Sequence, residues 1–282
     1  MHEWIVTKED TGLSLVAYIR KQLQSENLSS RQIKRAIESN ACSINQCCER
    51  FASRKVQSGD SIQFKFQTHT QKQSKNTPTY DAKRIIFHDT SILVYNKPAK
   101  IDVYSLESSI QTHHPSCRLV HRLDKDTSGV LLLAKDEKTL KQLTQQFAQR
   151  KAKKEYLAVV DGIVKKQKGK VMNKLGKRGS YQGQTLWGED KNGKEAITYW
   201  EKVKEGSDWT LLRCYPQTGR THQIRVHLSQ LAYPILGDMQ YGRQQALRGL
   251  ERHLLHAASL EINGMRFEAP SDWEDFHHKG LS

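Results

Sequence analysis

Long apolar runs are missing from this sequence. The chain starts Met1-His2-Glu3-Trp4-Ile5-Val6, without a positively charged flank followed by an apolar core. The aliphatic run from Val130 to Leu133 is far too short to span a bilayer and is typical of an interior strand. We therefore expect no signal peptide, no transmembrane helix and no membrane partner.

Paired cysteines are missing as well. The five cysteines are odd in number, irregularly spaced and without a C-x-x-C pair; they are Cys42, Cys47, Cys48, Cys117 and Cys214. This arrangement predicts neither a zinc site nor a disulfide framework. We expect reduced thiols, as in a cytoplasmic protein.

Acidic residues are scarce beside basic ones. Asp and Glu number 30 against 45 Lys and Arg, which leaves a formal net charge of +15 at pH 7. Such a surplus favours a polyanionic partner, and nucleic acid is a commoner one than a membrane surface. The 282 residues suffice for one large domain or two modest ones.

Two short helices and a small sheet are predicted before residue 68. Apolar residues at four-residue steps over residues 11–26 predict an amphipathic helix, and Ser29 or Ser30 can cap a second one. The second helix has an apolar face with Ile33 and Ile37 and a basic face with Arg31, Lys34 and Arg35. Strands are expected at 42–45 and 62–66. Residues 67–80 have almost no aliphatic side chains and predict a linker.

Strands dominate the prediction for the rest of the chain. A hairpin is expected over residues 85–95, a helix capped by Asp136 later in the chain, and a strand at 155–162. Strands at 193–200 and 209–215 are expected to pair as antiparallel neighbours. The Gly- and Lys-rich segment 163–193 predicts either a loop or hairpin over RNA phosphates or merely a soluble surface.

A cluster of charged and hydroxyl residues stands directly before the aliphatic run. Alone, this pattern indicates a basic loop that leads into a core strand. Its order, His121-Arg122-Leu123-Asp124-x-x-Thr127-Ser128-Gly129, resembles the signature of the RluA-type pseudouridine synthases. The resemblance implies that Asp124 is the catalytic aspartate and that Arg122 enters the RNA helix as the target uridine leaves it. It also implies that the turn at Thr127 positions the aspartate, and it includes His121 and Thr127 in the expected RNA-binding set.

Three further stretches are similar to the same family. The stretch Lys154-x-Tyr156-x-Ala158-x-Val160 implies that Tyr156 lies against the target base. The stretch 218–228, continued by Gly237-Asp238-x-x-Tyr241-Gly242, implies that Arg225 pairs with the catalytic aspartate. The stretch Leu254-Leu255-His256-Ala257 implies that Leu255 packs under the base. Outside this context, Tyr156 and Leu255 would be interpreted as ordinary core residues.

The region 11–66 resembles an S4-type RNA-binding module. The resemblance is carried by Ser30-Arg31-x-Ile33-x-x-Ala36-Ile37, Ser43-Ile44-Asn45 and Val56-x-x-Gly59-Asp60. It implies that Arg31, Lys34 and Arg35 contact RNA, whereas without it they are only a solvated helix face. Gln46 and Lys100 stand where the two families often have glycine, so the turn at each position can follow a different path.

The residues suit an isomerisation better than a hydrolysis. Breaking the bond between N1 and C1′ of uridine develops positive charge on the sugar, which a carboxylate can stabilise or trap. Glycoside hydrolysis uses two carboxyl groups, but an isomerisation that retains the uracil needs only one. Asp126, the other acid of the motif, is assigned a structural role. Arg225 is expected to keep Asp124 ionised through a two-point contact.

Neither a cofactor nor a metal is predicted, because the reaction needs no redox step. His222 and His227 are five positions apart on an expected helix. They lack the carboxylate of the H-E-x-x-H spacing that would indicate a zinc site.

The sequence thus predicts an α+β protein in three parts. These are an S4-like domain at 1–68, a linker at 69–80 and a catalytic domain at 81–282 on a largely antiparallel mixed β-sheet. The resemblance implies uridine-to-pseudouridine isomerisation in structured RNA, with large-subunit ribosomal RNA first and transfer RNA second, by a cytoplasmic monomer. Two alternatives stay open: a non-catalytic RNA-binding or ribosome-assembly protein, and a nucleoside hydrolase.

Overall fold

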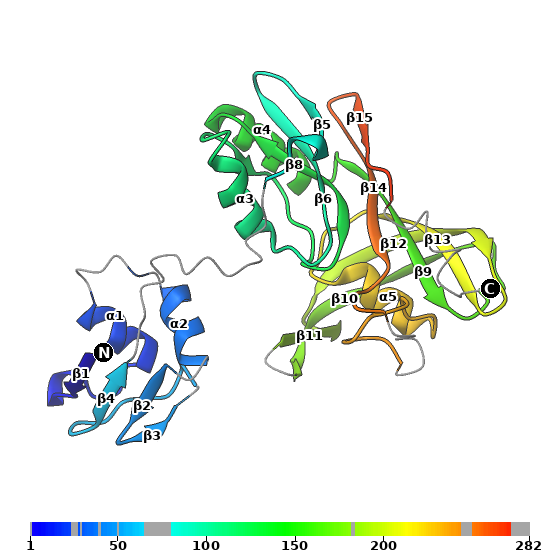
Figure 1. Ribbon diagram of the computed structural model, residues 1–282. Coiled ribbons are helices and arrows are strands. Elements are labelled where there is room, and N and C mark those ends of the chain that lie inside the picture. The colour runs from blue at the N-terminus through cyan, green and yellow to red at the C-terminus, as the bar shows by residue number, and fades with distance from the viewer. Residues whose placement is uncertain are drawn as a thin grey trace. The chain divides into compact units, whose positions relative to one another are not determined.

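The chain divides into two units whose described residues share no hydrophobic core cluster. The computed structural model (Figure 1) describes residues 2–23, 28, 30–38, 41–49, 51–64, 80–181, 184–243 and 250–271. The chain separates into two units, Met1–Lys75 and Asn76–Ser282. Within the described ranges, no helix has the length and apolar character needed to cross a membrane. Of the predicted linker 69–80, all but Tyr80 lies outside the described residues.

The first unit is a four-stranded antiparallel sheet with two helices. Its strand order is β1 (His2–Ile5), β4 (Ser61–Phe64), β2 (Cys42–Ile44) and β3 (Cys47–Cys48). A short 3-10 turn at Lys8–Asp10 precedes helices α1 (Leu15–Gln22) and α2 (Ser30–Glu38). The apolar steps of the sequence form the core, which includes Leu15, Ile19, Leu23, Ile33 and Ile37.

Capping sets the start of α1. The helix begins at Leu15 rather than at residue 11, because the Ser14 hydroxyl accepts a hydrogen bond from the Ala17 N–H. Ser29, one of the two residues predicted to cap α2, lies outside the described residues.

The turn between β2 and β3 consists of two residues in the left-handed conformation. Asn45 has φ 49° and Gln46 has φ 67°, and Ile44 pairs with Cys47 across them. Two-residue hairpins favour positive φ at both positions, a conformation that glycine adopts at the least cost. Gln46 therefore holds a backbone conformation that suits glycine. Lys100 (φ 65°) does the same in the second unit.

The second unit is built on one large mixed sheet. The order along it is β11-β10-β12-β13-β9-β14-β8-β6-β5, with β15 beside β14 and β7 beside β8. The strands are β5 (Ile85–His88), β6 (Ile92–Lys97), β7 (Arg118–Leu119), β8 (Ser128–Ala134), β9 (Lys153–Asp161), β10 (Lys168–Tyr181), β11 (Gln184–Glu189), β12 (Lys194–Glu205), β13 (Trp209–Pro216), β14 (Leu255–Ile262) and β15 (Met265–Glu268). These neighbours pair antiparallel, except that β8 and β14 are parallel. The predicted α+β class with a largely antiparallel mixed sheet is confirmed.

Strand β8 is buried on both faces, which explains the aliphatic run. Val130 and Leu132 belong to the core cluster of α4 (Glu137–Ala148), and Leu131 and Leu133 to that of α3 (Val103–Gln111). Successive strand residues point to opposite faces, so cover on both faces requires a continuous apolar stretch. Asp136 caps α4 as predicted, since its carboxylate accepts from the Thr139 N–H.

Helix α5 (Gln223–Gln230) covers the other half of the sheet. Its Ile224 and Leu228 pack with Ala158, Trp200 and Leu212 of β9, β12 and β13. Strands β12 and β13 pair antiparallel, as predicted. The Gly- and Lys-rich segment forms the β10–β11 hairpin at the end of the sheet.

Candidate active site

Asp124 lies in the loop between β7 and β8, on a turn that is fixed to β6. The Thr127 N–H donates to the Asp124 carbonyl at 3.1 Å. The fully buried ammonium of Lys97 donates to the Lys125 carbonyl at 2.9 Å, and to two further carbonyls of the loop after β6. The Asp124 side chain stays 18% exposed, so the loop presents it to solvent.

The same turn is anchored on the opposite side to β14 and to the residues before it. The Thr127 hydroxyl lies 2.9 Å from His253 Nε2, and burial lowers the pKa of His253 to about 3. Gly129 has φ 111°, and a Cβ added there would lie 2.1 Å from the Ala257 carbonyl oxygen. Only glycine permits both this backbone conformation and this approach of β8 to β14.

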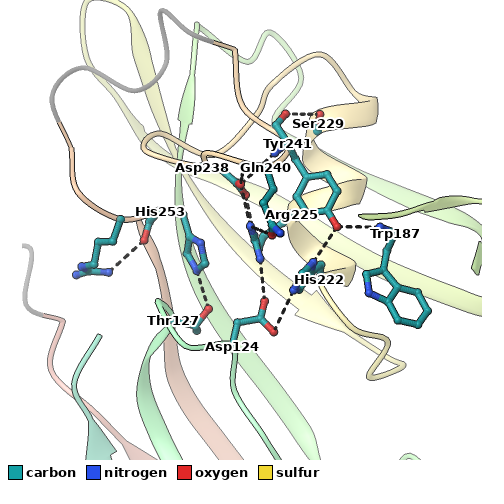
Figure 2. Close-up of polar contacts among 11 residues, drawn as sticks. Asp124, Thr127, Trp187, His222, Arg225, Ser229, Asp238, Gln240, Tyr241 and His253 are labelled. Atoms are coloured by element: carbon teal, nitrogen blue, oxygen red, sulfur yellow. Dashed lines mark hydrogen bonds and ion pairs between the residues drawn. The ribbon is translucent and has the colours of Figure 1, made fainter. Parts of the chain in front are cut away.

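Arg225 of α5 faces Asp124 with one nitrogen only. Its Nη1 donates to Asp124 Oδ2 at 3.4 Å (Figure 2). The two-point contact is made with Asp238 instead, from Nε at 2.7 Å and Nη2 at 2.9 Å. The predicted two-point contact with Asp124 is therefore wrong, because the buried Asp238 takes that side of the guanidinium. Burial alone would raise the pKa of Asp238, but the hydrogen bonds and charge of Arg225 bring it below its ordinary value.

His222, directly before α5, faces the same carboxylate. Its backbone is left-handed (φ 56°), and its Nε2 lies 3.9 Å from Asp124 Oδ1. Its Nδ1 lies 2.8 Å from the Tyr241 hydroxyl, which accepts a hydrogen bond from the Trp187 N–H at 3.0 Å (Figure 2). Burial lowers the pKa of His222, so the neutral ring is favoured at pH 7.

Asp124 lines a cavity of about 400 Å³, which is within the usual size range of ligand sites. Tyr156 of β9 and Leu255 of β14 line it from the same sheet face, because Leu255 pairs with Ala158, two residues after Tyr156. Burial, with Asp124 nearby, raises the pKa of Tyr156, so its hydroxyl stays protonated at neutral pH. A ring and an aliphatic side chain beside a carboxylate suit a flat base attached to a sugar.

The cavity is strongly basic. Of its lining residues only Asp124 is acidic, whereas five are cationic: Arg122, Arg150, Lys154, Arg220 and Arg225. Burial, together with Arg150 and Arg220, lowers the pKa of Lys154 to about 8. Such a lining suits the phosphodiester backbone of a nucleic acid.

The structure brings together every site residue that was predicted for the second unit. The cavity is lined by His121, Arg122, Asp124, Thr127, Tyr156, Arg225 and Leu255. Arg122 is exposed. His121 stacks on Phe147, its Nε2 accepts from the Leu132 N–H at 3.0 Å, and burial lowers its pKa to about 3. The catalytic and RNA-binding roles of these residues stay predictions.

The predicted RNA contacts of the first unit lie on α2. Lys34 is exposed there, while the side chains of Arg31 and Arg35 lie outside the described residues. Their role stays a prediction.

Three residues that hold the site in place were not predicted: Lys97, Asp238 and His253. Asp238 stands in a recognised motif, but nothing in the motif reveals its partner. His253 contacts a residue 126 positions away, and Lys97 one 28 positions away. Hydrophobic periodicity carries no signal for such contacts.

The two histidines of the α5 region do not converge. His222 contacts Tyr241, while His227 contacts Thr198 and Asn173 in the interior. Throughout the described ranges, no group of three His, Cys, Asp or Glu residues could hold a metal ion. The expectation of neither metal nor cofactor stays a prediction.

Known proteins resemble this chain in sequence. The family profile described as RNA pseudouridylate synthase matches residues 91–230. An uncharacterized RNA pseudouridine synthase of Zymomonas mobilis is 37% identical over 193 residues, which cover 64% of this chain and 88% of that protein. The ribosomal large subunit pseudouridine synthase C of Buchnera aphidicola subsp. Acyrthosiphon pisum is 35% identical over 215 residues, 72% of this chain and 68% of that protein. The Escherichia coli K12 protein of the same name is 37% identical over 211 residues, 67% of this chain and 66% of that protein.

A solved structure agrees with this result. The human RNA pseudouridylate synthase domain containing 1 protein superposes with a TM-score of 0.62 at 25% identity, covering 68% of this chain and 84% of that one. The chain belongs to the RNA pseudouridylate synthase family and is an enzyme of that class. Within the family it is similar to proteins named ribosomal large subunit pseudouridine synthase C. The profile match lies in the second unit, so the S4-like assignment of the first stays a prediction.

Proposed function

We propose that this enzyme isomerises uridines of large-subunit ribosomal RNA, with Asp124 as the reacting carboxylate. The names of the Escherichia coli and Buchnera relatives support the ribosomal substrate, and a net charge of +15 suits a long polyanion. Transfer RNA is the second candidate. A ribosomal substrate would place the enzyme, which we expect to act as a monomer, in the cytoplasm.

The observation that carries the proposal is the convergence of one carboxylate, the Tyr156 ring and several cations in one cavity. Asp124, Tyr156, Leu255, Arg122 and Arg225 come from four separate motifs, and all line that cavity. If each motif had only a structural role, its residues would not need to line one solvent-accessible cavity together.

The reaction moves the uracil from an N1 to a C5 linkage without net loss of atoms. The bond from N1 to C1′ breaks, the uracil turns, and a bond from C5 to C1′ forms, while C5 loses a proton and N1 gains one. The cleavage develops positive charge at C1′, which the Asp124 carboxylate can stabilise or trap. Among the described residues, no second carboxylate lines the cavity, which favours isomerisation over hydrolysis.

The target base must first leave the RNA stack, at a cost of a few kcal/mol. Arg122 is exposed two residues before Asp124 and can fill the space that the base leaves. Tyr156 can stack on the extruded uracil and return about 1–3 kcal/mol. Leu255 supports the base from the neighbouring strand.

We infer that the first unit docks the RNA in the manner of an S4 module. Helix α2 buries Ile33 and Ile37 in the core and exposes Lys34, so its basic positions alternate with its apolar ones. Arg31 and Arg35 follow the same helical spacing as Lys34. A separate core allows this unit to contribute affinity without contributing to the chemical step.

Tritium release tests the assignment of Asp124. In ribosomal RNA labelled with tritium at uridine C5, isomerisation releases the label to water because C5 exchanges its hydrogen for carbon. We expect Asp124→Asn to abolish release, at least about 10⁴-fold, while retaining RNA binding. Asp126→Asn is the matched control, since this carboxylate lies two residues away and does not line the cavity; it should retain release within about threefold. Equal release by wild type and Asp124→Asn would refute the assignment.

Three further measurements distinguish the alternatives. Mapping of pseudouridine in RNA from cells with and without the gene identifies the modified position and decides between ribosomal and transfer RNA. Free uracil in the supernatant would indicate a nucleoside hydrolase. RNA binding without any release of label would indicate a non-catalytic assembly protein.

A further inference from the structure

The turn from Gly237 to Gly242 has no role in the reaction described so far, yet it is tightly built. Gly237 has φ 75°, and a Cβ there would lie 2.0 Å from the Arg252 carbonyl oxygen. The Gly242 N–H donates to the Asp238 carbonyl at 2.9 Å. This geometry fixes the Asp238 side chain between the turn and α5.

The Asp238 carboxylate receives four hydrogen bonds. Two come from the backbone N–H groups of Gln240 at 3.0 Å and Tyr241 at 3.1 Å. The other two come from Nε and Nη2 of Arg225. The Asp238 side chain is only 1% exposed, so its carboxylate is buried and both of its oxygens accept hydrogen bonds. Short, charge-assisted, two-point bonds of this kind fix orientation as well as charge.

The guanidinium is therefore held on three sides. Gln240 Oε1 accepts a second bond from Nη2 at 2.7 Å, and the Tyr241 ring lies 5.0 Å from the Arg225 Cζ (Figure 2). Only Nη1 remains to face Asp124, at 3.4 Å. An arginine without these partners would turn its two-nitrogen edge to the nearest carboxylate, which is Asp124.

These contacts affect both the charge around Asp124 and the lone pairs that its oxygens have free. Asp238 matches the positive charge of Arg225, so Asp124 is not the sole counter-ion of that arginine. A two-point ion pair would engage both oxygens of Asp124 and oppose their approach to C1′. The single 3.4 Å contact from Arg225, with His222 Nε2 3.9 Å from the other oxygen, orients the carboxylate and leaves it available to react.

We propose that Asp238 is a positioning residue that holds the edge of Arg225 away from Asp124, so that Arg225 orients the reacting carboxylate without sequestering it. This inference rests on the proposed role of Asp124. Asp238 touches neither substrate nor the reacting atoms, and it acts only through Arg225.

The test compares Asp238→Asn with wild type by release of tritium from C5-labelled large-subunit ribosomal RNA. Asparagine keeps the size and one acceptor for the turn, but its amide opposes an N–H group of Arg225 and frees the guanidinium. We expect kcat to fall about 10- to 100-fold while KM for RNA stays within about twofold. Glu155→Gln is the matched control. Glu155 precedes Tyr156 on β9, so its side chain points to the opposite face of the sheet, where it pairs with Arg213 and Arg266. It should retain wild-type kcat.

A double-mutant cycle separates this role from a merely structural one. Lysine cannot form the two-point bond, so in an Arg225→Lys background Asp238→Asn should lower kcat by no more than about twofold. Multiplicative losses in the double mutant would overturn the proposal, as would an unchanged kcat in Asp238→Asn.

A milder variant keeps the proposal testable if Asp238→Asn fails to fold. Gln240→Met removes one acceptor from Arg225 at a half-buried position, and we expect kcat to fall about threefold with KM unchanged. Gln240→Glu keeps an acceptor and should retain the wild-type kcat. An unchanged kcat in Gln240→Met would count against the proposal. Absence of release by wild type refutes the proposed function itself, whereas release by wild type that these variants do not alter refutes only this inference.

Discussion

Lys97 connects the catalytic loop to the sheet at the cost of burying a cationic group. Its side chain is fully buried, and its ammonium donates to three backbone carbonyls, including that of Lys125 beside Asp124. Burial lowers the pKa of Lys97 to about 7, although Asp126 and Asp124 favour the charged form. The group therefore titrates near neutral pH in the folded enzyme.

This titration predicts a pH dependence of stability. The folded-state pKa of Lys97, about 7, lies below its ordinary value of 10.5. Between these pKa values, Lys97 is protonated in the unfolded chain and neutral in the folded chain. Its contribution to the unfolding free energy therefore rises with pH and is lost as pH falls to 7. We expect the unfolding free energy of wild type relative to Lys97→Met to rise by about 3.5 kcal/mol from pH 7 to pH 10. Urea denaturation measures it, and a difference that stays constant with pH would show that Lys97 titrates normally.

Gly129 predicts a sharper loss of stability. Alanine there must accept a φ of 111° and must displace the Ala257 carbonyl, 2.1 Å from its Cβ. We expect Gly129→Ala to lower the unfolding free energy by about 3 kcal/mol in urea denaturation. Gly179→Ala is the control, since no atom lies within 4 Å of a Cβ at that position. If the two substitutions cost the same, the close approach of β8 and β14 does not constrain the fold.

At this scale the sequence predicted which residues gather, but not how they bond. Asp124, Tyr156, Arg225 and Leu255 were found because motifs keep their order along the chain. Arg225 contacts Asp124 as predicted, but the predicted two-point contact is wrong, because two carboxylates compete for one guanidinium and the buried Asp238 takes its two-nitrogen edge. Lys97 was missed because lysine is ordinarily an exposed residue.

At the scale of elements, a chain of hydrogen bonds connects β11 to the start of α5. The Tyr241 hydroxyl accepts from the Trp187 N–H of β11, so its own hydrogen is available for His222 Nδ1. The proton of the neutral His222 ring then lies on Nε2, which faces Asp124 Oδ1. The hairpin is thereby coupled to the orientation of the carboxylate.

This arrangement predicts a single tautomer. We expect nitrogen NMR of histidine-labelled enzyme at pH 7 to show His222 neutral and protonated at Nε2, because burial lowers its pKa and Tyr241 occupies Nδ1. His222→Gln assigns the signal. Tyr241→Phe should produce a mixture of tautomers, and an Nδ1-protonated ring in wild type would contradict the hydrogen-bond direction.

Elements were predictable where one physical signal dominates. The capped helix after Asp136 and the pairing of β12 with β13 followed from local patterns. The parallel pairing of β8 with β14 joins Gly129 to Ala257, and no local pattern reveals a contact over that separation. The sequence of the β10–β11 hairpin does not predict its strands, because glycine and lysine are poor strand formers. Pairing with the neighbouring strand β12 orders this segment.

At the scale of the whole molecule, we propose that the first unit contributes RNA affinity and the second unit the chemistry. The first unit has its own apolar interior and the second contains the complete cavity. Since counterion release scales with the number of phosphates contacted, each basic side chain that touches the backbone steepens the salt dependence of binding. Variants in the first unit should therefore alter binding and leave turnover unchanged.

The last prediction concerns α2 in the intact enzyme. We expect Arg31→Gln, Lys34→Gln and Arg35→Gln together to reduce the slope of log affinity against log salt concentration by about 2, because each contact contributes about 0.7–0.9. The single-turnover rate at saturating RNA should stay within about twofold, because Asp124 and its partners are unchanged. Lys83→Gln, Lys138→Gln and Lys141→Gln together remove the same charge from the second unit outside the cavity lining, and should change the slope by less. If the two triple variants have equal slopes, α2 contributes to RNA binding only through the net charge of the protein. A docking surface would require these charges to lie on α2.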